Sequence, residues 1–202
     1  RPYGRGSATL LGFTLAPLAE GQPEHQSFIN QLAAQAEVRR HATSDSLALH
    51  VVERATPAGS PSPTGFLFVV NPWAWPVCSG LAYTDPVTGE PARLPRLLPG
   101  IEFNKQGGLI LCLEAPIPGT ELIIAYSTSQ VQGWSLTGDR VTLVLHGQPN
   151  TMGETALRVP PGTTHPAIAS ASRSEWLADD RGDLLVVTYP HHRGVAMLHL
   201  QT

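Results

Sequence analysis

Short β-prone runs separated by closely spaced turn signals fill the chain from Gly65 onward, and this alternation constrains the fold most. Glycine- and proline-containing turns recur between the runs at intervals of about 8–12 residues. A low charged fraction of 14%, with 19 glycines and 19 prolines, is typical of a turn-rich β protein. The pattern predicts an antiparallel β-sandwich, immunoglobulin-like or jelly-roll-like, over residues 65–202. The predicted strands are Phe66–Val70, Val77–Tyr83, Arg93–Leu97, Ile101–Phe103, Leu109–Leu113, Glu121–Tyr126, Arg140–His146, Glu154–Val159, Leu184–Tyr189 and Val195–Leu200.

A different pattern precedes the β-rich part. Ser7–Leu11 and Leu47–Val52 are short β-prone apolar runs, and Pro23–Arg40 between them carries apolar residues at helical spacing. Residues 1–55 are therefore predicted to be the end of an α/β segment of strand, helix and strand. Such a unit cannot bury both faces of its sheet alone, so it must lean on other parts of a protein. The Pro- and Ser-rich residues 56–64 are predicted to be a linker or a long hairpin loop.

Charge and hydropathy limit the classes of partner. The net charge is −3 and Lys105 is the single lysine, whereas an electrostatic nucleic-acid footprint needs a basic stripe. The longest apolar run is too short to span a bilayer. We therefore predict no nucleic-acid partner and no membrane partner. Cys78 and Cys112 lie in apolar runs, which favours buried thiols, with a disulfide between them left open. Neither has a second cysteine at ligand spacing, so no metal or other cofactor is predicted.

No signal peptide opens the chain, which starts with Arg1 and not Met. We therefore expect a fragment or a processed product. The compartment stays open between cytoplasmic and secreted, and the sequence does not fix the oligomeric state.

Two polar clusters lie in predicted turns. Asp179, Asp180 and Asp183 are interpreted as a solvated hairpin loop, with a calcium site as the alternative. His191 and His192 follow a proline and are interpreted as exposed loop histidines, with a metal site as the alternative.

Nothing in the sequence marks a catalytic group. Ser127 and Ser129 flank Thr128 in a Tyr-Ser-Thr-Ser block, where hydroxyls at a strand end commonly satisfy backbone groups. The carboxylates of Glu114, Glu121 and Glu154 are expected to serve strand edges and turns. No catalytic residue is therefore predicted.

Trp73 and Trp75, between two prolines, are the candidates for direct carbohydrate contact. Exposed indole rings two residues apart could stack on sugar rings, whereas buried rings would serve as core or inter-domain packing. Both interpretations stay open.

Three stretches resemble the C-terminal region of bacterial β-galactosidases of glycoside hydrolase families 35 and 42. The stretches are Tyr3–Gly12, Gly65–Pro72, and Ile123–Val159, the last of which is interpreted as three strands joined by turns. In those enzymes the first is similar to the end of an α/β domain and the second to the strand that opens a β domain. The resemblance implies a parent enzyme that acts on β-galactosides or a related glycan through glutamates on a (β/α)₈ barrel. No barrel fits in these residues, since about 250 are typical.

The sequence therefore predicts a non-catalytic accessory region of a β-galactosidase-like glycoside hydrolase. Its partner would be the catalytic barrel of the parent enzyme or another subunit, and a glycan is a further candidate. This hypothesis predicts an exposed apolar surface where the barrel docks. The alternatives are an independent carbohydrate-binding module, a protein-interaction β-sandwich, and, last, a self-sufficient hydrolase with two carboxylates converging in a pocket.

Overall fold

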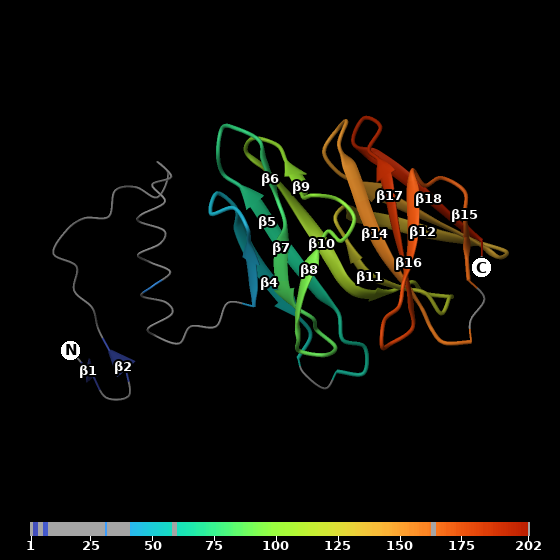
Figure 1. Cartoon of the computed structure of the whole chain (residues 1–202), viewed down its shortest axis with the longest axis horizontal. Helices are drawn as coiled ribbons and strands as arrows, with labels where there is room; N and C mark the ends of the chain where they lie inside the picture. The colour runs from blue at the N-terminus through green and yellow to red at the C-terminus, as the bar shows by residue number, and fades with distance from the viewer. Residues whose placement is uncertain are drawn as a thin grey trace. The chain divides into compact units, whose positions relative to one another are not determined.

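The computed structural model describes residues 2–3, 6–7, 31, 41–57, 60–162 and 165–201 (Figure 1). The chain divides into two compact units, residues 1–40 and residues 41–202. In the first unit, β1 (Pro2–Tyr3) pairs with β2 (Gly6–Ser7) as a two-stranded antiparallel ribbon. Apart from Ser7 and position 31, the predicted strand Ser7–Leu11 and the predicted helix Pro23–Arg40 lie outside the described residues.

The second unit is mainly β, as predicted, and is built from antiparallel sheets that form a β-sandwich. Its largest sheet has seven strands in the order β16-β17-β14-β11-β10-β5-β4, with β16 and β4 at its two edges. The bounds of these strands are β4 His50–Ala55, β5 Gly65–Asn71, β10 Gly107–Pro116, β11 Ile123–Ser127, β14 Met152–Val159, β16 Arg173–Leu177 and β17 Asp183–Pro190.

Three smaller sheets accompany it. A four-stranded sheet has the order β12-β13-β18-β15, with β12 Gln130–Thr137, β13 Arg140–His146, β15 Ala167–Ile168 and β18 Val195–Gln201. A three-stranded sheet has the order β3-β7-β8, with β3 Ala42–Ser44, β7 Leu81–Thr84 and β8 Pro91–Leu94. β6 (Val77–Ser79) pairs with β9 (Ile101–Phe103).

Side-chain alternation gives the seven-stranded sheet a separate hydrophobic core on each face. On one face, Leu67, Leu111 and Tyr126 pack with residues of β7, β8 and β9. On the other, Ile124, Leu157 and their neighbours pack with β13 and β18. Strands β14 and β17 contribute to both cores and are buried along almost their whole length. The polar side chains of these two strands therefore lie inside the protein.

The described strands differ from the predicted ones at several places. The run Val77–Tyr83 is two strands, because Gly80 separates β6 from β7. The segment Ile123–Val159 contains four strands and not three, because it includes β12. Strand β12 escaped prediction because Gln130, Gln132 and Gly133 interrupt its apolar pattern and a bulge lies between positions 131 and 133.

The start of the sandwich also differs from the predicted outline. Strand β4 lies within a segment predicted as α/β, yet it pairs along its length with β5, from His50↔Val70 to Ala55↔Gly65. Residues 56–64 join these two antiparallel neighbours, which is the position of a hairpin loop. The compact β unit accordingly includes residues from position 41 onward.

Candidate functional site

An uncovered apolar face lies on the β4–β5–β10 end of the seven-stranded sheet. Cross-strand pairing aligns Val52 with Phe68 and Phe68 with Ile110, so the three side chains form one row. Phe66 and Val70 flank Phe68 on the same side of β5. All five side chains are exposed, from 38% for Phe68 to 50% for Val52. We call these five residues the β4–β5 face.

This face continues the core between the two largest sheets. Leu67 and Val69 alternate with Phe66, Phe68 and Val70 along β5 and point into the opposite core. Cys112 stands opposite Phe66 on β10 and is buried in the core that β13 and β18 cover. Among the described residues, one half of this side of the sheet is therefore covered, whereas the side chains of the other half are exposed. Since contiguous exposed apolar patches mark interaction sites, the open half is the leading candidate for a binding surface.

The two tryptophans predicted to contact carbohydrate lie together in the loop that follows β5. Their rings stack with centroids 5.0 Å apart and an interplanar angle of 16°. Trp73 is partly buried, and its Nε1 donates a hydrogen bond to the Ala48 carbonyl at 2.7 Å. Trp75 is 52% exposed. Trp73 thus has a packing role, and only Trp75 offers an open aromatic surface.

A buried asparagine holds this loop in place. The side chain of Asn71 donates hydrogen bonds to the carbonyls of Trp75 (2.8 Å) and Asn104 (2.9 Å) and accepts one from the Trp73 N–H (3.1 Å). The Gln106 N–H donates to the Trp73 carbonyl at 2.8 Å. The tryptophan loop and the 104–106 turn are therefore a single hydrogen-bonded unit.

The Tyr-Ser-Thr-Ser block lies at the centre of a buried hydroxyl network. The Oγ of Ser129 is 2.9 Å from the Tyr189 hydroxyl and 2.8 Å from Nε2 of His191. The Tyr189 hydroxyl is 2.7 Å from the Thr155 hydroxyl, which is 3.0 Å from that of Ser127. Burial raises the pKa of Tyr189 to about 12. Every hydroxyl of this network therefore has a partner inside the protein.

A serine hydroxyl beside an imidazole has the spacing of a nucleophile and its base. Here Ser129 is fully buried and His191 is 2% exposed, so no substrate can reach the pair. The other ring nitrogen of His191 is 3.1 Å from the Thr151 hydroxyl and not beside a carboxylate. Burial, with a smaller contribution from His146, lowers the pKa of His191 to about 4. The interpretation of His191 as an exposed loop residue is wrong, whereas His192 is exposed.

The predicted backbone role of the hydroxyls is confirmed for Ser127 and found at Thr128, but it is wrong for Ser129, whose Oγ contacts side chains. The Oγ of Ser127 accepts a hydrogen bond from the Ser129 N–H at 3.1 Å. The Oγ1 of Thr128 accepts one from the Glu154 N–H at 2.8 Å.

Glu154 is fully buried on β14, an inner strand of the seven-stranded sheet, so the expected role at a strand edge is wrong, whereas the expected role in holding a turn is found at residues 96–98. Its carboxylate accepts hydrogen bonds from the N–H groups of Arg96 (2.5 Å), Leu97 (2.8 Å) and Leu98 (2.9 Å). The Tyr126 hydroxyl donates a fourth bond at 2.6 Å. Burial and the nearby carboxylate raise the pKa of Tyr126 above its ordinary value. The side chain of Glu154 fastens the loop that follows β8 to the central sheet.

A second buried polar cluster surrounds two arginines. Arg158 forms ion pairs with Glu114 (2.9 Å) and Asp179 (2.5 Å). Arg181 forms ion pairs with Asp85 (2.6 Å) and Glu114 (3.1 Å). Burial alone would lower the pKa of Arg158, but the charges and hydrogen bonds of Glu114 and Asp179 raise it overall. These carboxylates are neutralised by arginines and are not placed to act on a substrate.

The interpretation of the Asp179 cluster as a solvated loop is wrong for Asp179, whose side chain is only 16% exposed. Burial opposes ionisation, but bonds from the Arg181 N–H and from Arg158 lower the pKa of Asp179 overall. Asp180 and Asp183 are exposed. Asp183 is 2.7 Å from the imidazole of His165.

Both cysteines are free, so the Cys78–Cys112 disulfide is not formed. Cys112 is buried, as predicted, and burial raises its pKa to about 12. Cys78 is exposed, which corrects the prediction of a buried thiol.

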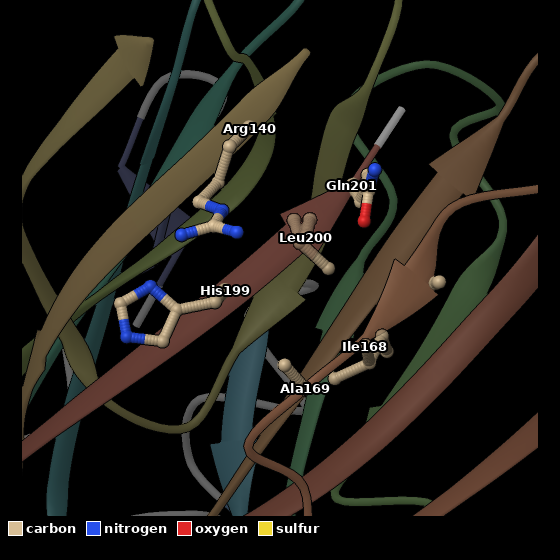
Figure 2. Close-up of a pocket in the computed structure, with 7 residues that line it drawn as sticks. Arg140, Ile168, Ala169, His199, Leu200 and Gln201 are labelled. Carbon is tan, nitrogen blue, oxygen red and sulfur yellow. The ribbon is translucent and has the colours of Figure 1, made fainter. Parts of the chain in front are cut away.

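A small open pocket of about 110 Å³ lies at the four-stranded sheet, lined mainly by residues of β13, β15 and β18 (Figure 2). Arg140 and His199 lie side by side at one end, and Ile168, Leu200 and Gln201 lie at the other. None of the lining residues is acidic, so the pocket does not provide the carboxylate pair of a glycoside hydrolase.

Within the described ranges, no three or more His, Cys, Asp or Glu side chains gather closely enough to hold a metal ion. No helix in that part of the chain is long and apolar enough to cross a membrane.

No protein-family model matches this chain, and no curated protein matches it. The fold of the described residues from position 41 onward defines the class of protein as an antiparallel β-sandwich.

Proposed function

We propose that this chain is a non-catalytic accessory region of a β-galactosidase-like glycoside hydrolase, and that the β4–β5 face docks on the catalytic barrel. The exposed row Val52, Phe68 and Ile110 is the observation that carries the proposal. An accessory region needs such an apolar surface, because burial of apolar area drives stable association between domains.

The burial of the carboxylates supports a non-catalytic role. Glu114, Asp179 and Glu154 are committed to arginines or to backbone N–H groups. A glycosidase requires an acid and a second carboxylate that both reach one sugar. Because these carboxylates are already paired, an accessory role is favoured over that of a self-sufficient hydrolase.

The rim of the β4–β5 face indicates the charge of its partner. His50 and Arg54 are exposed on β4, directly opposite Val70 and Phe66. A partner with acidic groups around an apolar centre complements this arrangement, since charged groups at a rim select partners and set orientation.

The proposal is tested first by the coding sequence immediately upstream of Arg1. That sequence is expected to encode a (β/α)₈ barrel in frame with this chain. A stop codon or a signal sequence in its place would overturn the proposal. The upstream polypeptide is then co-expressed with the 202-residue chain. Phe68→Lys should abolish copurification, whereas Met197→Lys, at an apolar side chain of 55% exposure on β18, should leave it unchanged. Equal copurification of both variants would remove the β4–β5 face as the docking surface.

A further inference from the structure

We propose that Trp75 forms a sugar-stacking subsite that takes the apolar face of a pyranose ring. The subsite lies in the loop after β5 and does not depend on the docking of the β4–β5 face. Trp73 covers one face of the Trp75 ring, at 5.0 Å and nearly parallel. With the side chain still 52% exposed, the opposite ring face is the surface left for a ligand.

The platform is fixed before any ligand arrives. Trp73 is anchored through its indole N–H to the Ala48 carbonyl. The backbone of Trp75 is held by the buried Asn71 amide, which also holds Asn104. A rigid aromatic group loses little conformational entropy on binding. The small free energy gained by stacking is therefore not cancelled by the cost of ordering the loop.

The turn that is hydrogen-bonded to the tryptophan loop carries side chains that suit a polyhydroxylated ligand. Asn104, Lys105 and Gln106 are exposed and belong to the turn that is hydrogen-bonded to the tryptophan loop. Amide and ammonium groups can donate to sugar hydroxyls, and the amide oxygens can accept from them. The electron-rich indole face attracts the polarised C–H groups of a sugar ring. The axial hydroxyl of galactose leaves several ring C–H groups together on one face, so galactose presents the kind of surface that stacks on an indole.

Trp134 and Trp176 provide a comparison within the same chain. Trp134 is 50% exposed on strand β12, and no stacked ring partner accompanies it among the described residues. Trp176 is 40% exposed, with His165 stacked 4.0 Å from it. The indole of Trp75 is stacked on a second tryptophan, and its loop is hydrogen-bonded to a turn with two amide side chains. These two features together single out Trp75 as the subsite.

The test is titration of the 202-residue chain with β-1,4-linked galactotriose, followed through the tryptophan indole N–H resonances by NMR. A dissociation constant on the order of 1 mM is expected for one stacking contact with few hydrogen bonds. The Trp75 resonance should shift, and Trp75→Ala should weaken binding at least tenfold. Trp134→Ala, the matched control of equal exposure, should bind as the wild type does.

Two results would overturn the inference. One is a Trp75 resonance that does not move at a galactotriose concentration of about 20 mM, well above the expected constant. The other is unchanged sugar affinity in Trp75→Ala, which would leave the indole as a packing contact for a docked protein. Neither result bears on the proposed docking of the β4–β5 face, which is tested by copurification.

Discussion

Replacing the buried carboxylate of Glu154 by an amide should destabilise the sandwich strongly. Glu154 is an acceptor only, and its four hydrogen bonds come from Arg96, Leu97, Leu98 and Tyr126. In Glu154→Gln the side chain keeps its shape but has one acceptor oxygen and one donor group. The variant therefore changes hydrogen-bonding capacity with almost no change in volume.

The magnitude follows from the geometry of the two carboxylate oxygens. Oε2 accepts from Leu97 and Leu98, and Oε1 accepts from Arg96 and Tyr126. If the amide oxygen takes the Oε2 position, the NH₂ group faces the Arg96 N–H donor, while the Tyr126 hydroxyl can turn and accept. The opposite orientation strands two N–H donors. Losing the charge and at least one bond, with hydrogen bonds to charged groups at about 1.5–3 kcal/mol each, gives a loss of about 2–4 kcal/mol.

The free energy of unfolding is measured by urea titration with tryptophan fluorescence and circular dichroism. Tyr126→Phe, which removes one bond to the charged carboxylate, should cost about 1.5–3 kcal/mol. Glu90→Gln, at an exposed carboxylate, should change stability by less than about 0.5 kcal/mol. If Glu154→Gln lost no more stability than Glu90→Gln, the carboxylate would not be what fastens the 96–98 loop.

Two further predictions concern other buried ionisable groups. In the folded protein the pKa of His191 is lowered from 6.5 to about 4. The unfolded chain therefore binds the proton more tightly than the folded one, and the free energy of unfolding falls as pH drops from about 6.5 towards 4. The wild type should lose about 2 kcal/mol more than His191→Gln between pH 7 and pH 5 in urea titrations; parallel pH profiles would contradict this. In Arg158→Leu, Glu114 and Asp179 lose the buried guanidinium that they share and keep only their longer contacts with Arg181, so the variant should cost about 3 kcal/mol by the same measurement. Arg173→Leu, at an ion pair exposed on both sides, should cost less than about 0.5 kcal/mol, and equal losses in the two variants would argue against the buried pairing.

The strands were predictable from the sequence where apolar runs are long and turns are marked. Ile101–Phe103 and Arg140–His146 are found with the predicted bounds. The turn after Thr137 is closed by Gly138 at φ = 60°, a conformation that glycine adopts without strain. Strand β12 lacked such a signal, because its apolar side chains are few and it lies at a sheet edge.

The buried polar groups were not predictable, for a different reason. Glu154 and His191 are polar, and polar residues are seldom buried unless hydrogen-bond partners are present. Their partners lie far along the chain: Arg96 is 58 residues from Glu154, and Ser129 is 62 residues from His191. Gly147 and Gly153 leave the room for the His191 ring, since an added Cβ would lie 2.2 Å and 2.7 Å from it. A sequence shows these glycines but not the ring that they admit.

The positions of polar and apolar side chains together support a dependent role for this chain. A sheet covered on both faces must bury the polar residues of its central strands, as Glu154 and Arg158 show on β14. The same sheet leaves Phe66, Phe68 and Val70 open at its other end, where a second layer is lacking among the described residues. A strand with apolar side chains on both faces, such as β5, is the pattern of an interior strand. Under the proposed function, a partner completes the layer over the β4–β5 face, which is the contact that Phe68→Lys tests.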